Sequence, residues 1–500
     1  MNATATFAEI TTLEQARVLV EQQFQTIQQL TWQLNQFKQQ LFGRSSERQT
    51  GEHFSKEQIL MSLFPAPAQP AATTEVVVPP TEERQPKRAR RQPAVKVLET
   101  VTERIEPREK VCAHCGQEKC EIGQEKSERF EYVPAKIVRH EIIRPKLACT
   151  CGQAGVSIAP LPPMVVAQGQ PGPGLLAHVI LTKFADHVPL HRQQQQLARL
   201  GVHFAKSTLG DWVEQAAVLL QPIAREMKRQ LLQSDYVQVD ETPVRVQDPD
   251  VVGKCATGWL WVLGAPQSDV IFEFHPGRGK EFAQALLGSF KGYLQRDGYG
   301  VYGSLVQDNP ELISVGCWSH ARRKFVDALE DQAQLATPVV NEIRKLYLVE
   351  RHARNECLTP TQRQQLRQQT SLPVLIALKP LLENLLDKVL PQSPAGKAAR
   401  YCLSEWAALN RYLENGRLEI DNNLTENAIR PSAIGKKNWL FIGHPDAGWR
   451  SAVIYSIVVS CRRRGIEPWG YLRDVLTRLP GMTQSELASV LPANWSPPSA

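Results

Sequence analysis

Cysteine is scarce in this chain of 500 residues, which holds 10, and no long apolar run interrupts it. So few thiols exclude the dense disulfide framework of small secreted proteins. The longest apolar stretch, AVIYSIVVSC, is far shorter than the roughly 20 residues of a membrane span, so we expect a buried helix and no membrane partner. No signal peptide is recognisable at the N-terminus, and we expect a reducing, cytoplasmic location.

A strong excess of one charge sign is also absent, and the chain is only moderately basic. Lys and Arg number 58 against 51 Asp and Glu, for a net charge of +7. This balance permits a polyanionic partner without requiring one. The length exceeds what one hydrophobic core can serve and predicts about three domains.

Residues 13–45 predict a coiled coil through which the chain forms a homo-oligomer. Apolar residues recur every seven positions, at Val20, Ile27, Leu34 and Leu41. Two more apolar residues, Leu30 and Phe37, follow three positions after Ile27 and Leu34, as in the a/d seam of a coiled coil. A single amphipathic helix packed on its own chain would show a similar pattern. Residues 46–106 are rich in Pro and contain PKRARR, a basic cluster in a flexible linker. This cluster could hold phosphates, or it could only keep the linker soluble.

Residues 107–162 predict a small zinc-binding module resembling a zinc ribbon. Two cysteine pairs, Cys112 with Cys115 and Cys149 with Cys151, flank a strand-like segment, and four thiolates suit one tetrahedral Zn²⁺. The second pair encloses one residue where two are usual, so His114 and Cys120 are alternative donors. Four unligated thiols in a small β-module are the other interpretation.

Residues 163–230 predict a helical segment with a helix-turn-helix-like corner. One helix ends near Gly201, and we expect Ser207 to cap the next. This shape suits DNA binding, although many all-helical domains contain such corners.

Residues 231–455 predict a mixed α/β domain, so the whole chain is a multidomain α+β protein. YVQVDETPVRV, GWLWVLG and DVIFEFHP are expected strands, followed by a helix, a strand ending at Asp297, a second helix and the strand ELISVGCW. Three meandering strands followed by a βα repeat are typical of a ribonuclease H-like catalytic core. We expect a helical insertion at 321–418, a closing helix from about Leu424, and a helical tail at 456–500.

Three acids of this domain form a candidate catalytic site. Asp240 lies in the first strand and Asp297 ends the fourth, and these strands are neighbours in a ribonuclease H-like sheet. Glu426, at the start of the closing helix, is the third. Such carboxylates favour two Mg²⁺ or Mn²⁺ ions, which catalyse phosphodiester chemistry when about 4 Å apart. Each acid also has an ordinary structural interpretation, and three other acids are rival ligands: Glu241, Asp308 and Asp421.

Basic and aromatic residues surround these acids in the sequence. Six cations are candidate DNA contacts or merely solvated charges: Arg322, Arg323, Lys324, Arg430, Lys436 and Lys437. Trp318 could stack on a base, although a core position is favoured. His320 could orient a carboxylate, move a proton or be structural. Trp439 and Phe441 are expected in the core.

Several long motifs resemble the insertion sequence 66 family of bacterial DDE transposases. They occur in that family's order: LFGRSSE, the cysteine module, KFADHVPLHRQ, VDETP, RDGYGVY, GCWSHARRKF, NNLTENAIRP, GKKNWLFIG and GIEPWGYLRDVLTRLP. The resemblance implies a ribonuclease H-like core with Asp240, Asp297 and Glu426 as its acids. It implies Mg²⁺-dependent cleavage and strand transfer at the ends of the chain's own element, on double-stranded terminal repeats and target DNA of the nucleoid.

The resemblance also implies an N-terminal zipper, a zinc finger and accessory proteins of the same element. Two alternatives stay open: a catalytically inactive or domesticated DNA-end-binding protein, and a ribonuclease H-like nuclease without strand transfer.

Overall fold

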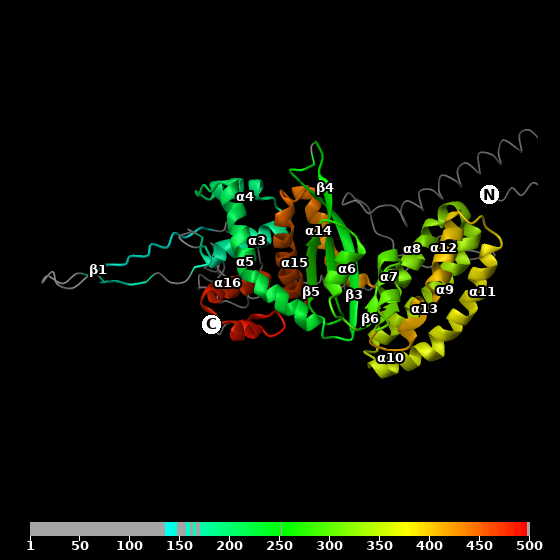
Figure 1. The fold of residues 1–500 in the computed structure, drawn as a ribbon. Coiled ribbons are helices and arrows are strands. Elements are labelled where there is room, and N and C mark those ends of the chain that lie inside the picture. The colour runs from blue at the N-terminus through cyan, green and yellow to red at the C-terminus, as the bar shows by residue number, and fades with distance from the viewer. Residues whose placement is uncertain (1–135, 148–156, 161–163, 167–170, 252, 498–500) are drawn as a thin grey trace, which may run out of the picture. The chain divides into compact units, whose positions relative to one another are not determined.

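The computed structural model describes residues 136–147, 157–160, 164–166, 171–251 and 253–497 (Figure 1). All of them belong to one compact unit, Glu128–Ala500. β1 (Lys146–Leu147) and β2 (Ser157–Ile158) form a short antiparallel pair. The predicted coiled coil, the basic linker and the four proposed zinc ligands lie outside the described residues.

A five-stranded mixed sheet with the order β5-β4-β3-β6-β7 forms the centre of this unit. β3 is antiparallel to β4, and β4 to β5, whereas β6 runs parallel to β3 and to β7. The bounds are β3 (Tyr236–Val246), β4 (Ala256–Gly264), β5 (Val270–His275), β6 (Gly292–Gln295) and β7 (Leu312–Val315). The predicted succession of strands and helices is confirmed, although β6 ends two residues before Asp297.

The two parallel connections pass through short helices, α6 (Lys280–Leu287) and α7 (Gly300–Asp308), as parallel strands require a crossover. Gly292 begins β6 with a φ of 125°, and a Cβ there would collide with the Asp235 backbone. Glycine at this position therefore lets β6 start directly beside β3.

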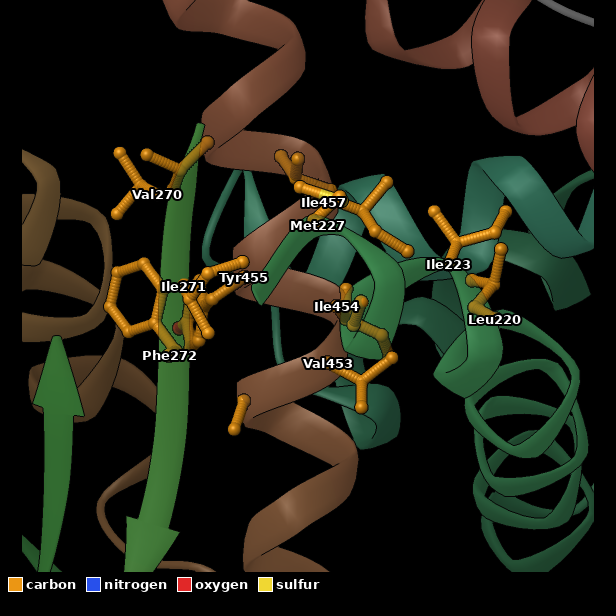
Figure 2. Close-up of a cluster of buried hydrophobic side chains, with 14 of the residues drawn as sticks. Leu220, Ile223, Met227, Val270, Ile271, Phe272, Val453, Ile454, Tyr455 and Ile457 are labelled. Atoms are coloured by element: carbon orange, nitrogen blue, oxygen red, sulfur yellow. The ribbon is translucent and has the colours of Figure 1, made fainter. Parts of the chain in front are cut away.

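Helix α15 (Gly448–Arg463) covers the edge strand β5 and packs between it and much of α5 (Lys206–Leu231), as Figure 2 shows. Its Ser456 and Ser460 hydroxyls accept the backbone N–H groups of Phe272 and Val270 at 2.8 and 2.9 Å. An edge strand with free N–H groups is a site for unwanted pairing. The serines close that edge from the helix side.

The remaining helices of this region join the same hydrophobic core. They are α3 (Pro173–Phe184), α4 (Leu190–Arg199), α14 (Asn423–Trp439) and α16 (Pro468–Arg478). AVIYSIVVSC is the buried centre of α15, as expected. The domain boundary that we placed at 455/456 therefore falls inside a continuous helix whose two halves share one core.

Between β7 and α14 lies a helical region with its own hydrophobic cluster. Its helices are α8 (Trp318–Asp327), α9 (Leu329–Asn355), α10 (Pro360–Leu366), the π-helical turn η2 (Arg367–Ser371), α11 (Leu372–Leu386), α12 (Pro394–Ser404) and α13 (Trp406–Asn410). The fully buried Arg367 donates to Glu350 at 2.7 Å and to the Leu418 carbonyl at 2.8 Å. Arg367 therefore links Glu350 of α9 to the segment that leads into α14.

Three expectations about single residues meet different outcomes. Ser207 does not cap its helix, because α5 begins at Lys206 with Ala205 as its N-cap. Trp318 is a core residue, fully buried with its indole N–H donated to the Leu409 carbonyl at 2.8 Å. Trp439 packs partly buried against the core, but Phe441 is exposed, so its predicted core position is wrong. Among the residues that the structure describes, no helix combines the length and apolarity of a membrane span.

Candidate carboxylate site

Asp240 lies in β3, and Asp297 lies just after the end of the neighbouring parallel strand β6. In the register of this pair Gln238 lies opposite Gln295, and each acid follows two residues later. Asp297 lies in the turn before α7, where its Oδ1 accepts the Tyr299 backbone N–H at 2.9 Å. Both acids therefore lie at the same end of the sheet.

Glu426 reaches this place from the first turn of α14, which packs on β3 and β4. A buried amide pair ties the start of this helix to the strands. Gln238 Nε2 donates to Gln295 Oε1 at 2.7 Å, and Thr425 Oγ1 donates to Gln238 Oε1 at 3.1 Å. Buried amides need such partners, so this network fixes the first turn of α14 against both strands.

The electrostatics of Asp240 reflect this crowding. Burial is the largest cause that raises its pKa from 3.8 to about 8, and the charges of Glu241, Asp297 and Glu426 also raise it. The Glu241 N–H, donated to Asp240 Oδ1 at 2.8 Å, acts in the opposite direction. A divalent cation would relieve the repulsion among these carboxylates. The donor set, hard oxygens only, fits Mg²⁺ or Mn²⁺.

The rival acids have other partners. Glu241 is buried and accepts from Arg278 Nε at 2.7 Å and from the Tyr302 hydroxyl. Asp308 is exposed on α7 and pairs with Lys280. Asp421 accepts the Tyr347 hydroxyl at 2.9 Å. All three rival acids therefore have a protein partner in the structure.

Helix α8 presents two residues to Glu426. His320 Nδ1 lies 3.6 Å from Glu426 Oε1, and Arg323 Nη2 lies 3.3 Å from Oε2. Cys317 joins them, since ligand atoms of Cys317, His320 and Glu426 all lie within 4.8 Å of one another. The thiol is fully buried, and burial raises its pKa to about 12. The position of His320 supports the predicted role of orienting a carboxylate. Nothing in the sequence indicated Cys317 at this place.

Of the predicted DNA contacts on α14, Arg430 and Lys437 are exposed. Lys436 is half-buried and donates to Thr242 Oγ1 at 3.1 Å and to the Pro243 carbonyl at 3.0 Å. Burial, with the charge of Lys437, lowers the pKa of Lys436. Lys436 thus ties α14 to β3 and is only partly free to meet a phosphate.

The predicted contacts on α8 are all exposed at the start of the helical region. Arg323 pairs with Glu426, as described above, and Lys324 Nζ lies 4.7 Å from the centre of the Tyr401 ring. Arg322 is the third. The structure thus brings Arg323 directly to the carboxylate site.

Arg278 is a positioning residue that we did not recognise from the sequence. Arg278 stacks between the rings of Trp259 and Tyr299, 4.8 and 3.6 Å from their centres, and binds Glu241. Tyr299 in turn donates its N–H to Asp297. Arg278 therefore braces the turn that carries the second acid, and only its neighbourhood in space reveals this.

Comparisons with known proteins identify the family of the chain. The family described as "Transposase IS66 family" matches residues 168–450, which include β3, β6, α14 and the three acids. The chain belongs to the IS66 transposase family. Three further descriptions match other parts of this IS66 chain: "zinc-finger binding domain of transposase IS66" at 109–152, "IS66 C-terminal element" at 456–493 and "Transposase C of IS166 homeodomain" at 29–102.

Two curated relatives from Sinorhizobium fredii resemble this IS66 chain over most of their length. "Uncharacterized protein y4qI" is 34% identical over 417 residues, which cover 80% of this chain and 76% of the relative. "Uncharacterized protein y4jD" is 33% identical over 407 residues, which cover 78% and 79%. The resemblance to IS66 transposases that the motifs indicate is therefore confirmed.

Proposed function

We propose that this IS66 protein cleaves DNA at the ends of its own insertion sequence and transfers the strand ends to a target by two-metal-ion chemistry. The observation that supports this most strongly is the proximity of three acids: Asp240 and Asp297 each follow two residues after a paired position of β3 and β6, and the charges of Asp297 and Glu426 both raise the pKa of Asp240. The sheet order and the helix α14 after the insertion agree with a ribonuclease H-like catalytic core.

In this proposal the three carboxylates would hold two Mg²⁺ or Mn²⁺ ions. When bound, such ions activate a water or a 3′-hydroxyl and stabilise the leaving oxygen of a phosphodiester. The protein's own part is to position ligands. Arg323 and His320 hold Glu426 from α8, and Arg278 braces the Asp297 turn through Tyr299. Fixed ligands require no rearrangement during the reaction.

The other proposed roles follow the family and the sequence. One Zn²⁺ would bind Cys112, Cys115, Cys149 and Cys151, and the exposed cations on α8 and α14 would contact the phosphates of double-stranded DNA. The N-terminal coiled coil would pair protomers, since joining two ends needs at least two. We place the protein in the cytoplasm on the nucleoid, with accessory proteins of the same element as possible partners.

Glu426→Gln tests the catalytic proposal. A labelled duplex carrying the element's end is incubated with Mg²⁺ and either wild type or the variant. We expect nicking to fall by more than 100-fold while DNA binding stays within twofold, because the change removes a metal ligand and spares the phosphate contacts (roughly the loss seen when one essential catalytic group is removed). Glu383→Gln, an exposed acid of α11, is the matched control.

Unchanged nicking in Glu426→Gln would show that the third ligand lies elsewhere. A second duplex, unlabelled, serves as target in the same reaction. Joined products support strand transfer, whereas nicked products alone would indicate a nuclease. Binding without nicking in the wild type would favour the inactive DNA-end-binding protein.

A further inference from the structure

The end of α14 carries two apolar side chains that face solvent. Leu440 is 60% exposed and Phe441 is 40% exposed, although both are large and hydrophobic. They directly follow Trp439, the last residue of the helix that carries Glu426. An exposed apolar pair at this place needs a physical explanation.

The backbone at this point is strained. Leu440 has φ 68° and ψ −49°, and the Phe441 N–H donates to the Trp439 carbonyl at 2.9 Å. This is the hydrogen bond of a three-residue γ-turn in its rare, strained form. A glycine would adopt the conformation more easily than leucine. Residues held in strained conformations concentrate at functional sites, and here the strain turns two apolar side chains outward.

Both flanks of the turn are fixed. The Leu440 N–H donates to the Lys436 carbonyl at 3.1 Å, and the Ile442 N–H donates to the Arg245 carbonyl at 2.9 Å. Ile442 is buried and pairs with the end of β3, while Trp439 packs against the core. The exposed pair is therefore held rigidly between the end of α14 and the end of β3.

The surroundings of this projection are basic. Lys437 of α14 and Arg245 of β3 are exposed near the turn, and Lys436 lies one helical turn before Leu440. Arg430 is exposed nearer the start of α14. No acid occurs between residues 427 and 445. The nearest acids in sequence are Asp446, which lies 3.4 Å from His444, and Asp248, next to the Gln247 that donates its N–H to the Ile442 carbonyl. Apolar side chains within a cationic surface are complementary to a nucleic acid, whose backbone is anionic and whose bases present apolar faces.

We propose that Leu440 and Phe441 form an apolar wedge that inserts between two bases of the DNA bound at the carboxylate site. This inference rests on the proposed function. Fourteen residues of helix separate Glu426 from Leu440, or about 21 Å at 1.5 Å per residue. For a duplex that runs along α14, at 3.4 Å per base step, the wedge meets the DNA roughly six steps from the cleaved bond. The helix thus fixes the distance between the reacting bond and a distorted step.

The test is a fluorescence scan with 2-aminopurine placed singly at each step of a duplex carrying the element's end. The protein is full-length Glu426→Gln, which leaves the DNA uncut. We expect a rise in fluorescence, which reports unstacking, at one or two adjacent steps roughly six from the cut. Adding Phe441→Ala removes the rise and weakens DNA binding roughly tenfold, as loss of one base stack does.

Two variants separate this role from a structural one. Leu440→Gly relieves the γ-turn, so its thermal midpoint stays equal or rises while the fluorescence signal falls. Ile376→Ala removes an equally exposed apolar side chain of α11 and leaves the signal unchanged. A signal that persists in Phe441→Ala overturns the wedge.

Loss of self-association in Phe441→Ala, with the fluorescence unchanged, also overturns the wedge and assigns the pair to a second copy of the chain. If wild-type protein fails to nick the DNA but still unstacks this base step, the proposed catalysis is wrong and the proposed wedge is supported.

Discussion

Asp240→Asn is expected to stabilise the metal-free protein while destroying its activity. Burial and the nearby carboxylates raise the Asp240 pKa from 3.8 to about 8. Between those values the folded state keeps a proton that the unfolded state has released, so stability falls as the pH rises. The slope is about 1.4 kcal/mol per pH unit, which amounts to about 4 kcal/mol by pH 7. Asparagine does not ionise and avoids this cost, and its oxygen can still accept the Glu241 N–H.

The assay compares the thermal midpoints of wild type and Asp240→Asn from pH 4 to pH 8 in buffer without added magnesium. The variant should match the wild type near pH 4 and become more stable as the pH rises. Added Mg²⁺ should raise the wild-type midpoint at pH 8 and leave the variant unmoved, because a ligand that binds only the folded state stabilises it.

Asp308→Asn is the matched control, since Asp308 is exposed on α7 and paired with Lys280. It should show neither the pH-dependent gain nor a loss of the Mg²⁺ response. If Asp240→Asn is destabilised at pH 7, or if its difference from wild type does not grow with pH, then Asp240 is not held in a crowded carboxylate cluster and the reasoning is refuted.

Two further predictions concern other parts of the chain. Arg367→Leu should lower the free energy of unfolding of the helical region by about 3–5 kcal/mol, because it leaves the buried Glu350 with one partner fewer. Urea denaturation measures this, with the exposed Lys379→Leu as control; a loss below 1 kcal/mol, roughly the value of a surface pair, would contradict the buried-pair reasoning. Cys112→Ser should lower the zinc content by one ion per chain and weaken DNA-end binding; unchanged metal content and binding would show that Cys112 is not a zinc ligand.

The sequence predicts the sheet well, because strand alternation and turn residues are local signals. The period of two in β3 puts Val237 and Val239 in the core, and the βα repeat orders the strands so that Asp240 and Asp297 share one end. The start of α14 was also predictable within a residue, from the change to a helical pattern near Leu424.

The errors arise where a contact distant in sequence decides the outcome. The sequence predicts Phe441 in the core, yet it is the next residue, Ile442, that pairs with β3, and the γ-turn at Leu440 turns Phe441 into solvent. The brace of Arg278 on Glu241 joins residues 37 positions apart, which no local periodicity reports. Cys317 lies beside Glu426 only because α8 and α14 begin at the same end of the sheet.

The long excursion between the second and third acids has a consequence for synthesis of the protein. Roughly 130 residues separate Asp297 from Glu426, and closing so long a loop in an unstructured chain costs several kcal/mol of entropy. Arg367 holds the segment before α14 by bonds to Tyr412, Asn415 and Leu418 carbonyls, so the folded helices shorten that loop. A ribosome-bound chain therefore carries two acids long before it can present the third. Under the proposed function, cleavage therefore requires that translation has passed α14.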